Sequence, residues 1–356
     1  MISLDNTEAM QKLDAENHLK NIQEFPEQAE NCWKDWQKTA LPTNFIQAKN
    51  IVMAGMGGSG IGCSIIANLA CRAPLPITVL QDYTLPGFVS KDTLFVAVSY
   101  SGNTEETIRT LKQAAELTQK IITISTGGKV ESLSTNYRTP HYKINYGSEP
   151  RAALGYSLTA LLAIFSKLKF IELKDDDFKE AIILLRGLQK KIDVGISSVY
   201  NPAKILTQKL YGKIPIVYGA GAMAEVARRW KGEFNENAKS ASYFEILPEL
   251  NHNALVGLQF PENLRTKIFV VILESKFNHP RNRLREKITA QILQKNQILT
   301  ENILLEPSPT PLAEILQMIH FGDYVSYYLG ILNNIDPNPV EIIGFLKDKL
   351  AEEPFE

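Results

Sequence analysis

The sequence predicts an α/β protein with two doubly wound parallel-sheet domains related by internal duplication, an N-terminal helical arm and a C-terminal helix. Short apolar runs rich in β-branched residues alternate with helical segments, as in parallel sheets. A strand, a glycine turn and a helix follow one another twice, at 51–72 and again at 213–230. At 356 residues the chain is also longer than one core usually supports.

The chain is expected to divide into an arm at 1–48, a first domain at 49–190 and a second domain at 191–356. The arm mixes polar and apolar residues as helices packed on a domain do, and it carries no pattern typical of a chemical site. A charged helix, from Lys174 to about Lys191, is expected to connect the two domains.

Strands are predicted where short apolar runs lie between turn residues. In the first domain these runs are 51–54, 77–80, 93–98, 121–124 and 141–144. In the second domain they are 213–218, 242–246, 267–273 and 297–305. A long apolar helix is expected from Pro311 and a terminal helix at 340–350.

Three hydroxyl side chains, Ser99, Ser101 and Thr104, follow the predicted strand at 93–98 and precede a helix that begins near Glu105. The free N–H groups and the dipole of a helix N-terminus favour an anion at such a turn. We therefore expect a phosphate-binding cradle; the alternative is an ordinary serine-rich turn. The second copy reads Glu-Ser-Lys-Phe at 274–277, which indicates that only the first copy kept this cradle.

The turn after the first strand admits two interpretations. Gly55, Gly57 and Gly60 match the G-x-G-x-x-G fingerprint of dinucleotide-binding folds, and Asp82 stands where a ribose-binding acid would. This would predict an NAD-dependent oxidoreductase. The pair Gly58-Ser59 instead suits contact with sugar hydroxyls, and a neighbouring phosphate cradle favours a sugar phosphate.

Arg151 is expected in the first turn of an apolar helix that opens near Pro150, where the helix dipole disfavours a cation. Something anionic should therefore compensate it. A salt bridge to Glu149 would do so, and so would a negative charge on a substrate.

Composition excludes several classes of function. A net charge of −1 with 22% charged residues gives no field for nucleic acid or an anionic membrane, and neither a membrane-spanning apolar run nor a signal peptide is recognisable. Cysteines and histidines form no metal-binding pattern; they stand at Cys32, Cys63, Cys71, His18, His141, His252, His279 and His320. We expect a cytoplasmic protein without a metal site.

Further motifs occur in a fixed order along 45–350. They are Gly57-Gly58-Ser59, the cradle at 99–104, Pro150-Arg151 with Leu154-Gly155-Tyr156, Phe234-Asn235-Glu236-Asn237 with Lys239, Glu249-Leu250-Asn251-His252-Asn253, and 339–347. Together they resemble the bifunctional phosphoglucose/phosphomannose isomerases, a family of double sugar-isomerase (SIS) domain enzymes. The resemblance implies two SIS domains, a homodimer, and an enzyme that needs neither a metal nor an organic cofactor.

The same resemblance implies roles for individual residues. Ser99, Ser101 and Thr104 would bind the phosphate of a sugar phosphate, with Gly58 and Ser59 also contacting the substrate. The catalytic residues would be an enediolate-stabilising Arg151, a proton-transferring base Glu236, a ring-opening His252 from the partner subunit, and Lys347 beside the ring oxygen.

The chemistry is consistent with these roles. Aldose–ketose isomerisation moves a proton between C1 and C2 through a planar enediol, so one carboxylate can remove and return it. The same intermediate can be reprotonated to either C2 epimer, which predicts activity on glucose 6-phosphate and mannose 6-phosphate. Taken without their motifs, Glu236 would be a solvated helix carboxylate and His252 a loop residue capping the backbone.

Two positions depart from the family pattern: Cys63 replaces a smaller residue, and Asn338 stands where threonine is frequent. The second lies near the expected C-terminal active-site helix and bears on epimer selectivity. A non-catalytic sugar-phosphate sensor is a further alternative, although it would not need Glu236 and His252.

Overall fold

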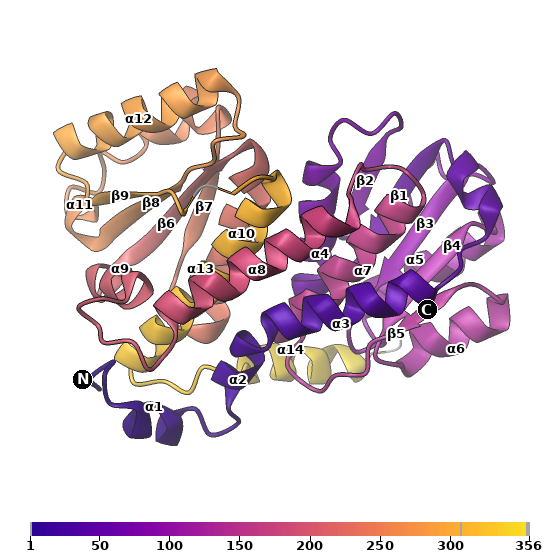
Figure 1. Ribbon diagram of the computed structural model, residues 1–356, viewed down its shortest axis with the longest axis horizontal. Coiled ribbons are helices and arrows are strands. Elements are labelled where there is room, and N and C mark those ends of the chain that lie inside the picture. The colour runs from indigo at the N-terminus through magenta and orange to yellow at the C-terminus, as the bar shows by residue number, and fades with distance from the viewer. Residues whose placement is uncertain (1, 307, 354–356) are drawn as a thin grey trace.

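The computed structural model describes residues 2–306 and 308–353. Two parallel-sheet α/β units lie side by side, with helices between them (Figure 1). The two-sheet architecture that the sequence predicts is confirmed; the division at 1–48, 49–190 and 191–356 stays a prediction.

The first sheet has the strand order β2-β1-β3-β4-β5, and each neighbouring pair is parallel. Ala54 of β1 lies beside Leu80 of β2 and Ala97 of β3, so these three strands end at the same level. The segments that follow them therefore meet at one edge of the sheet, where open α/β sheets bind ligands. The strands are β1 (Asn50–Ala54), β2 (Ile77–Leu80), β3 (Thr93–Val98), β4 (Ile121–Ser125) and β5 (His141–Lys143).

Alternate side chains of these strands enter two different cores, as the pleat requires. Met53 and Val96 face the large core that continues into the second domain. Val52 and Phe95 face a smaller core on the opposite side of the sheet. The helices of this half are α4 (Gly57–Leu69), α5 (Glu105–Leu117), α6 (Gly128–Tyr137), the 3-10 turn η2 (Pro150–Ala153), α7 (Leu154–Lys167) and α8 (Asp175–Ile192).

The second sheet, β7-β6-β8-β9, repeats the order of the first four strands of its counterpart. Gly219 of β6 lies beside Ile246 of β7 and Leu273 of β8, so here too the strand ends meet. The strands are β6 (Ile214–Ala220), β7 (Tyr243–Leu247), β8 (Ile268–Leu273) and β9 (Thr300–Ile303). The helical elements are α9 (Pro202–Leu210), η3 (Gly221–Met223), α10 (Ala224–Asn237), η4 (Glu249–His252), η5 (Ala254–Val256), α11 (Leu264–Lys267), α12 (Pro280–Lys295), α13 (Pro311–Leu332) and α14 (Glu341–Ala351).

Several element bounds differ from the sequence-based expectation. Arg151, expected in the first turn of a helix, lies in the 3-10 turn η2, and α7 begins after it at Leu154. Helix α4 begins at Gly57, four residues before the predicted start at Ile61, because Gly57 adopts φ = 51° and turns the chain directly into the helix. Strand β9 is shorter than the predicted 297–305, because Gln297 has φ = 60° and belongs to the preceding turn.

The N-terminal arm consists of α1 (Thr7–Leu13), α2 (His18–Gln23), α3 (Phe25–Lys38) and a short 3-10 turn, η1 (Thr43–Gln47). The arm contacts both units. Trp33 stacks on Phe178 of α8 with ring centroids 4.3 Å apart, and α3 also packs along α7. Nearer the N-terminus, the carboxylate of Asp5 accepts a 2.7 Å hydrogen bond from the backbone N–H of Ser198.

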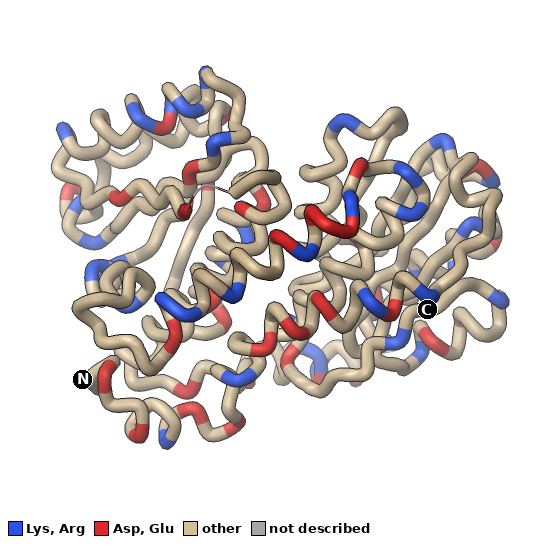
Figure 2. The backbone as a smooth tube through the Cα atoms, in the orientation of Figure 1, with Lys and Arg blue, Asp and Glu red and all other residues tan. Residues whose placement is uncertain are grey.

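Acidic and basic residues are interspersed along the backbone of both units (Figure 2). Within the described residues, none of the helices has the length and apolar character needed to span a bilayer. Helix α13 is long and almost wholly buried, but it contains Glu314 and Asp323 and packs inside the protein.

Candidate active site

A cavity of about 330 Å³ lies between the two units, bounded by the start of α4 and by one side of α10. The residues that line it include Gly57, Gly58, Gln81, Arg151, Arg228, Glu233 and Glu236. Of the nine site residues predicted from the sequence, the structure thus brings Gly58, Arg151 and Glu236 to one cavity.

The glycine turn allows an unusually close approach of two backbones. A Cβ atom on Gly58 would lie 2.9 Å from the carbonyl oxygen of Pro150 and 3.1 Å from the Cα of Arg151. Because Gly58 has no side chain, η2 can sit directly against α4 and bring Arg151 to the cavity wall. The space beside Gly57 is open, and a Cβ atom at that position would have no neighbour within 4 Å among the described residues.

The cradle forms a tight turn at the N-terminus of α5. The hydroxyls of Ser99 and Thr104 are 2.8 Å apart, and Ser101 Oγ accepts a 3.3 Å hydrogen bond from the N–H of Asn103. Gly102 has φ = 69°, and a Cβ there would lie 1.8 Å from the carbonyl oxygen of Gly127. Only glycine therefore fits this turn.

The cradle is joined to the glycine turn but does not line the cavity itself. Ser59 Oγ accepts a 3.1 Å hydrogen bond from the N–H of Tyr100, which fixes the two loops against each other. Ser99 is 1% exposed whereas Ser101 is exposed, so the turn offers its hydroxyls to different degrees. Thr104 is the N-cap of α5, and its side chain makes no capping hydrogen bond to that helix.

Arg151 is 2% exposed and joins three parts of the chain. Its Nε donates to Asn237 Oδ1 at 2.8 Å, and its Nη2 donates to the carbonyl oxygens of Pro337 at 2.9 Å and Asn338 at 2.7 Å. Its Nη1 lies 3.5 Å from Glu236 Oε2 and 3.8 Å from Glu149 Oε2. The salt bridge to Glu149 that we considered from the sequence is therefore present, together with a closer contact to Glu236.

Glu236 stands in the last turn of α10, with its side chain 31% exposed at the cavity. One turn earlier, Glu233 is buried and paired with Arg229 at 2.8 Å. Burial raises the pKa of Glu233. Asn237 donates to Glu233 at 2.9 Å while it accepts from Arg151, so the buried ionic network sets the orientation of the Arg151 guanidinium.

Sequence reasoning missed several residues of this site. Arg228 Nη2 donates to Gln81 Oε1 at 2.6 Å, which links the two units at the cavity. Lys239 donates to the carbonyl oxygens of Glu236 at 2.8 Å and Pro337 at 2.9 Å, and burial and nearby Arg151 lower its pKa to about 8. Lys239 could have been recognised as a site residue by its spacing after the Asn-Glu-Asn motif. Nothing in the sequence around Gln81 indicates that it belongs to the site.

The N-terminal arm also reaches the site, although its sequence carries no pattern that indicates chemistry. His18 is 1% exposed and lies beside the side chains of Asn338 and Asn237. Burial and the nearby charge of Arg151 lower the pKa of His18 to about 3. Its imidazole is therefore neutral beside the guanidinium. Glu16 accepts a hydrogen bond from the Asn338 side chain, so the arm holds the start of the C-terminal segment.

Two predicted catalytic residues lie outside the cavity lining. His252 is exposed in η4, which follows β7. Lys347 is exposed on α14, whose residues are all exposed up to Leu350. Within one chain these two side chains are not gathered with Arg151 and Glu236 at the cavity.

Asp82, the acid that a dinucleotide-binding site would use, accepts a 2.6 Å hydrogen bond from the N–H of Tyr83 and is not among the residues that line the cavity. The glycines of the turn have another physical role: a Cβ on Gly60 would lie 2.4 Å from the carbonyl oxygen of Gly55. Close packing of strand, turn and helix explains Gly55 and Gly60, and the positive φ of Gly57 explains the glycine between them.

Two protein families match the chain. The SIS domain family matches residues 44–168, and the bacterial phospho-glucose isomerase C-terminal SIS domain matches residues 199–350. A solved tagatose-6-phosphate ketose/aldose isomerase from Escherichia coli has a similar fold, with a TM-score of 0.70, 13% identity, and coverage of 91% of this chain and 95% of that one.

Curated relatives match over nearly their whole length. The bifunctional phosphoglucose/phosphomannose isomerase of Caldicellulosiruptor bescii is 37% identical, covering 94% of this chain and 99% of its own. The protein of the same name from Aquifex aeolicus is 34% identical, covering 95% and 99%. The chain belongs to the bifunctional phosphoglucose/phosphomannose isomerase family.

Proposed function

We propose that this protein interconverts fructose 6-phosphate with glucose 6-phosphate and with mannose 6-phosphate through an enediol intermediate. The observation that carries the proposal is the placement of Glu236 3.5 Å from Arg151 at a cavity between the two units. A carboxylate there can move a proton between C1 and C2, and a fixed guanidinium can stabilise the enediolate oxygens as charge develops.

The phosphate is assigned to the cradle formed by Ser99, Ser101 and Thr104, and Gly58 and Ser59 connect this cradle to the cavity. Hydroxyl groups beside a helix N-terminus are suited to a dianionic phosphate. When the cradle binds the phosphate, the open-chain sugar is held in position for proton transfer at C1 and C2. The energy of phosphate binding thereby contributes to orienting the substrate.

His252 and Lys347 are proposed to complete the site in a homodimer. Both are exposed and outside the cavity of their own chain. In a two-fold dimer, both copies use the same surface at the interface. A loop that lies outside the cavity of its own chain can therefore reach the cavity of the partner chain. His252 would then open the sugar ring in the partner subunit's cavity, with Lys347 near the ring oxygen.

The activity is tested by incubating the protein with fructose 6-phosphate in deuterium oxide and following the products by NMR. We expect glucose 6-phosphate and mannose 6-phosphate to form, both carrying deuterium at C2, at a rate that EDTA does not change. A sugar-phosphate sensor would give no product, and an oxidoreductase would require added NAD.

Sharing of His252 predicts complementation between two inactive variants. Glu236→Gln and His252→Ala proteins, once mixed and allowed to exchange subunits, should regain up to about a quarter of the parent activity. Half of the dimers in an equal random mixture are then heterodimers, and each has one intact site. Verified exchange without recovered activity would place both residues in the site of a single chain.

A further inference from the structure

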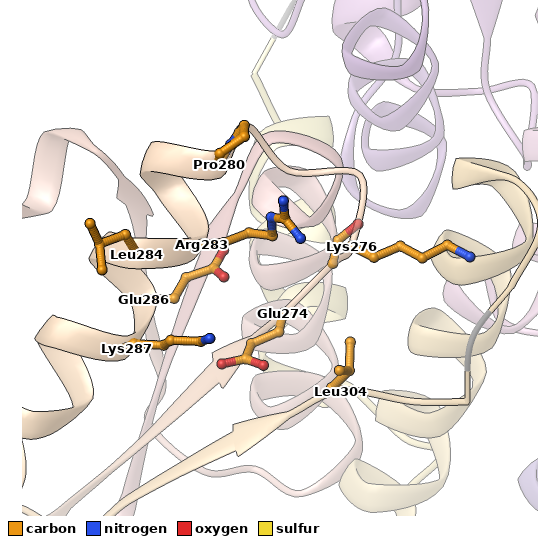
Figure 3. Close-up of a pocket in the computed structure, with 9 residues that line it drawn as sticks. Glu274, Lys276, Pro280, Arg283, Leu284, Glu286, Lys287 and Leu304 are labelled. Atoms are coloured by element: carbon orange, nitrogen blue, oxygen red, sulfur yellow. The ribbon is translucent and has the colours of Figure 1, made fainter.

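A second cavity, of about 460 Å³, lies in the second domain at the carboxyl ends of β8 and β9, beside α12 (Figure 3). Because β6, β8 and β9 repeat the order of β1, β3 and β4, this position corresponds to the cradle of the first domain. Open parallel sheets bind ligands at this edge. The proposed isomerase reaction makes no use of it.

The loop after β8 binds an anion that the chain itself supplies. The hydroxyl of Ser275 donates to a carboxylate oxygen of Glu314 on α13, and the N–H of Lys276 also bonds to that carboxylate. Glu314 is 6% exposed and thus supplies an anion from within the protein. Any ligand in the neighbouring cavity must be held by side chains instead.

Two cationic side chains are placed to bind such a ligand. Arg283 and Lys287 are one helical turn apart on α12, and their charged ends point into the space between that helix and the strand ends (Figure 3). Within residues 2–306 and 308–353, neither charged end makes a hydrogen bond or a salt bridge within 4 Å, although both act on the nearby carboxyl of Glu286. Two cations that face one cavity suit a phosphate, which an arginine can bind through two donors.

The cavity also has acceptors suited to hydroxyl groups, and they lie beside the two cations (Figure 3). Glu286 is 1% exposed, and one of its oxygens accepts a 2.8 Å hydrogen bond from Asn278. Burial raises the pKa of Glu286 to about 7, so its carboxyl repels an anion less than a fully charged group would. Glu274 accepts a 2.6 Å hydrogen bond from Asn302 and faces the same space (Figure 3).

We propose that this cavity is a second, non-catalytic binding site for a small phosphate monoester that carries hydroxyl groups. Arg283 and Lys287 bind the phosphate, and the hydroxyls bond to Glu274 and Glu286. The cavity volume of about 460 Å³ is within the range of small-ligand pockets.

Sorbitol 6-phosphate is a suitable probe, because it has no carbonyl group and cannot be isomerised. Titration calorimetry on the full chain should detect two binding events per chain, and sorbitol without phosphate should give neither. The Arg283→Ala/Lys287→Ala variant should lose one event, or weaken it about tenfold or more, since two charge-assisted contacts are removed. Both residues are exposed, so the fold is not at risk.

Lys295→Ala is the matched control, since it removes a charge from the last turn of the same helix, away from the cavity. It should retain both events. Isomerase activity should be unchanged in the double and the control variants, which separates this test from that of the proposed function. A parent protein with fewer than two events, a double variant that binds like the parent, or equal weakening by Lys295→Ala would each overturn the proposal.

Discussion

Replacing Glu236 by glutamine is expected to lower kcat at least about a hundredfold, and up to about ten thousandfold, for both aldose phosphates. Glutamine keeps the shape of the side chain but cannot accept the proton, and general-base catalysis typically supplies a factor of this size. Substrate binding should survive, because the cradle is unaltered. Steady-state kinetics and deuterium incorporation at C2 measure the two effects separately.

Glu149→Gln is the matched control for this experiment. Glu149 also lies near Arg151, at 3.8 Å, and its side chain is 34% exposed against 31% for Glu236. If proximity to the guanidinium alone mattered, both variants would lose activity alike. We expect the Glu149 variant to remain within a few-fold of the parent. Exchange at C2 that persists in Glu236→Gln would exclude Glu236 as the base and turn attention to Glu233.

Replacing Arg151 by methionine should affect both stability and catalysis. The change leaves the carbonyl oxygens of Pro337 and Asn338 and the amide of Asn237 without their donor in a buried place. Removing one partner of a buried, hydrogen-bonded charge typically costs about 3–5 kcal/mol. Loss of a donor that stabilises the enediolate lowers kcat by about a further hundred- to thousandfold. Urea unfolding and kinetics measure these two losses.

Arg151→Lys separates the two contributions, because it keeps the charge but not the planar fork that bonds three groups at once. It should recover part of the stability but little of the kcat. Arg228→Lys is the control on the same cavity, where the guanidinium donates to Gln81, lies 3.6 Å from Glu225 and is 38% exposed. An Arg151→Lys enzyme with parent-like kcat would show that the fork is not needed for the reaction.

The sheets were predictable because buried parallel strands are continuous apolar runs. The strands at 77–80 and 93–98 have the predicted bounds, and the turn at Gly102 and the helix after it lie where the hydroxyl pattern indicated. The predicted starts of α4 and β9 were wrong, because in each case the φ angle of one residue decides where the element begins. Gly57 starts α4 early, and Gln297 delays β9, and neither angle follows from residue type alone.

The partners within the site were not predictable, because they come from distant parts of the chain. The carbonyl group of Pro337 that holds Arg151 is 186 residues away, and the Gln81–Arg228 hydrogen bond spans 147. His18 illustrates the same limit: a lone histidine in a helical arm carries no pattern, yet tertiary packing buries it beside Asn237. The residue types of the site could be predicted from motifs, but their connections required the fold.

Glu314 makes the stability of the two duplicated loops depend differently on metabolites. A loop that binds its anion from solution gains stability whenever it is occupied, by about 2.7 kcal/mol when the ligand is at a hundred times its Kd. In the loop at Ser275 the anion is the carboxylate of Glu314, which belongs to the same chain. Its effective concentration at the loop is therefore fixed and does not depend on metabolites. The order of the Ser99–Thr104 turn should therefore rise and fall with the supply of sugar phosphate, while the Ser275 hydroxyl keeps Glu314 as its partner at any concentration.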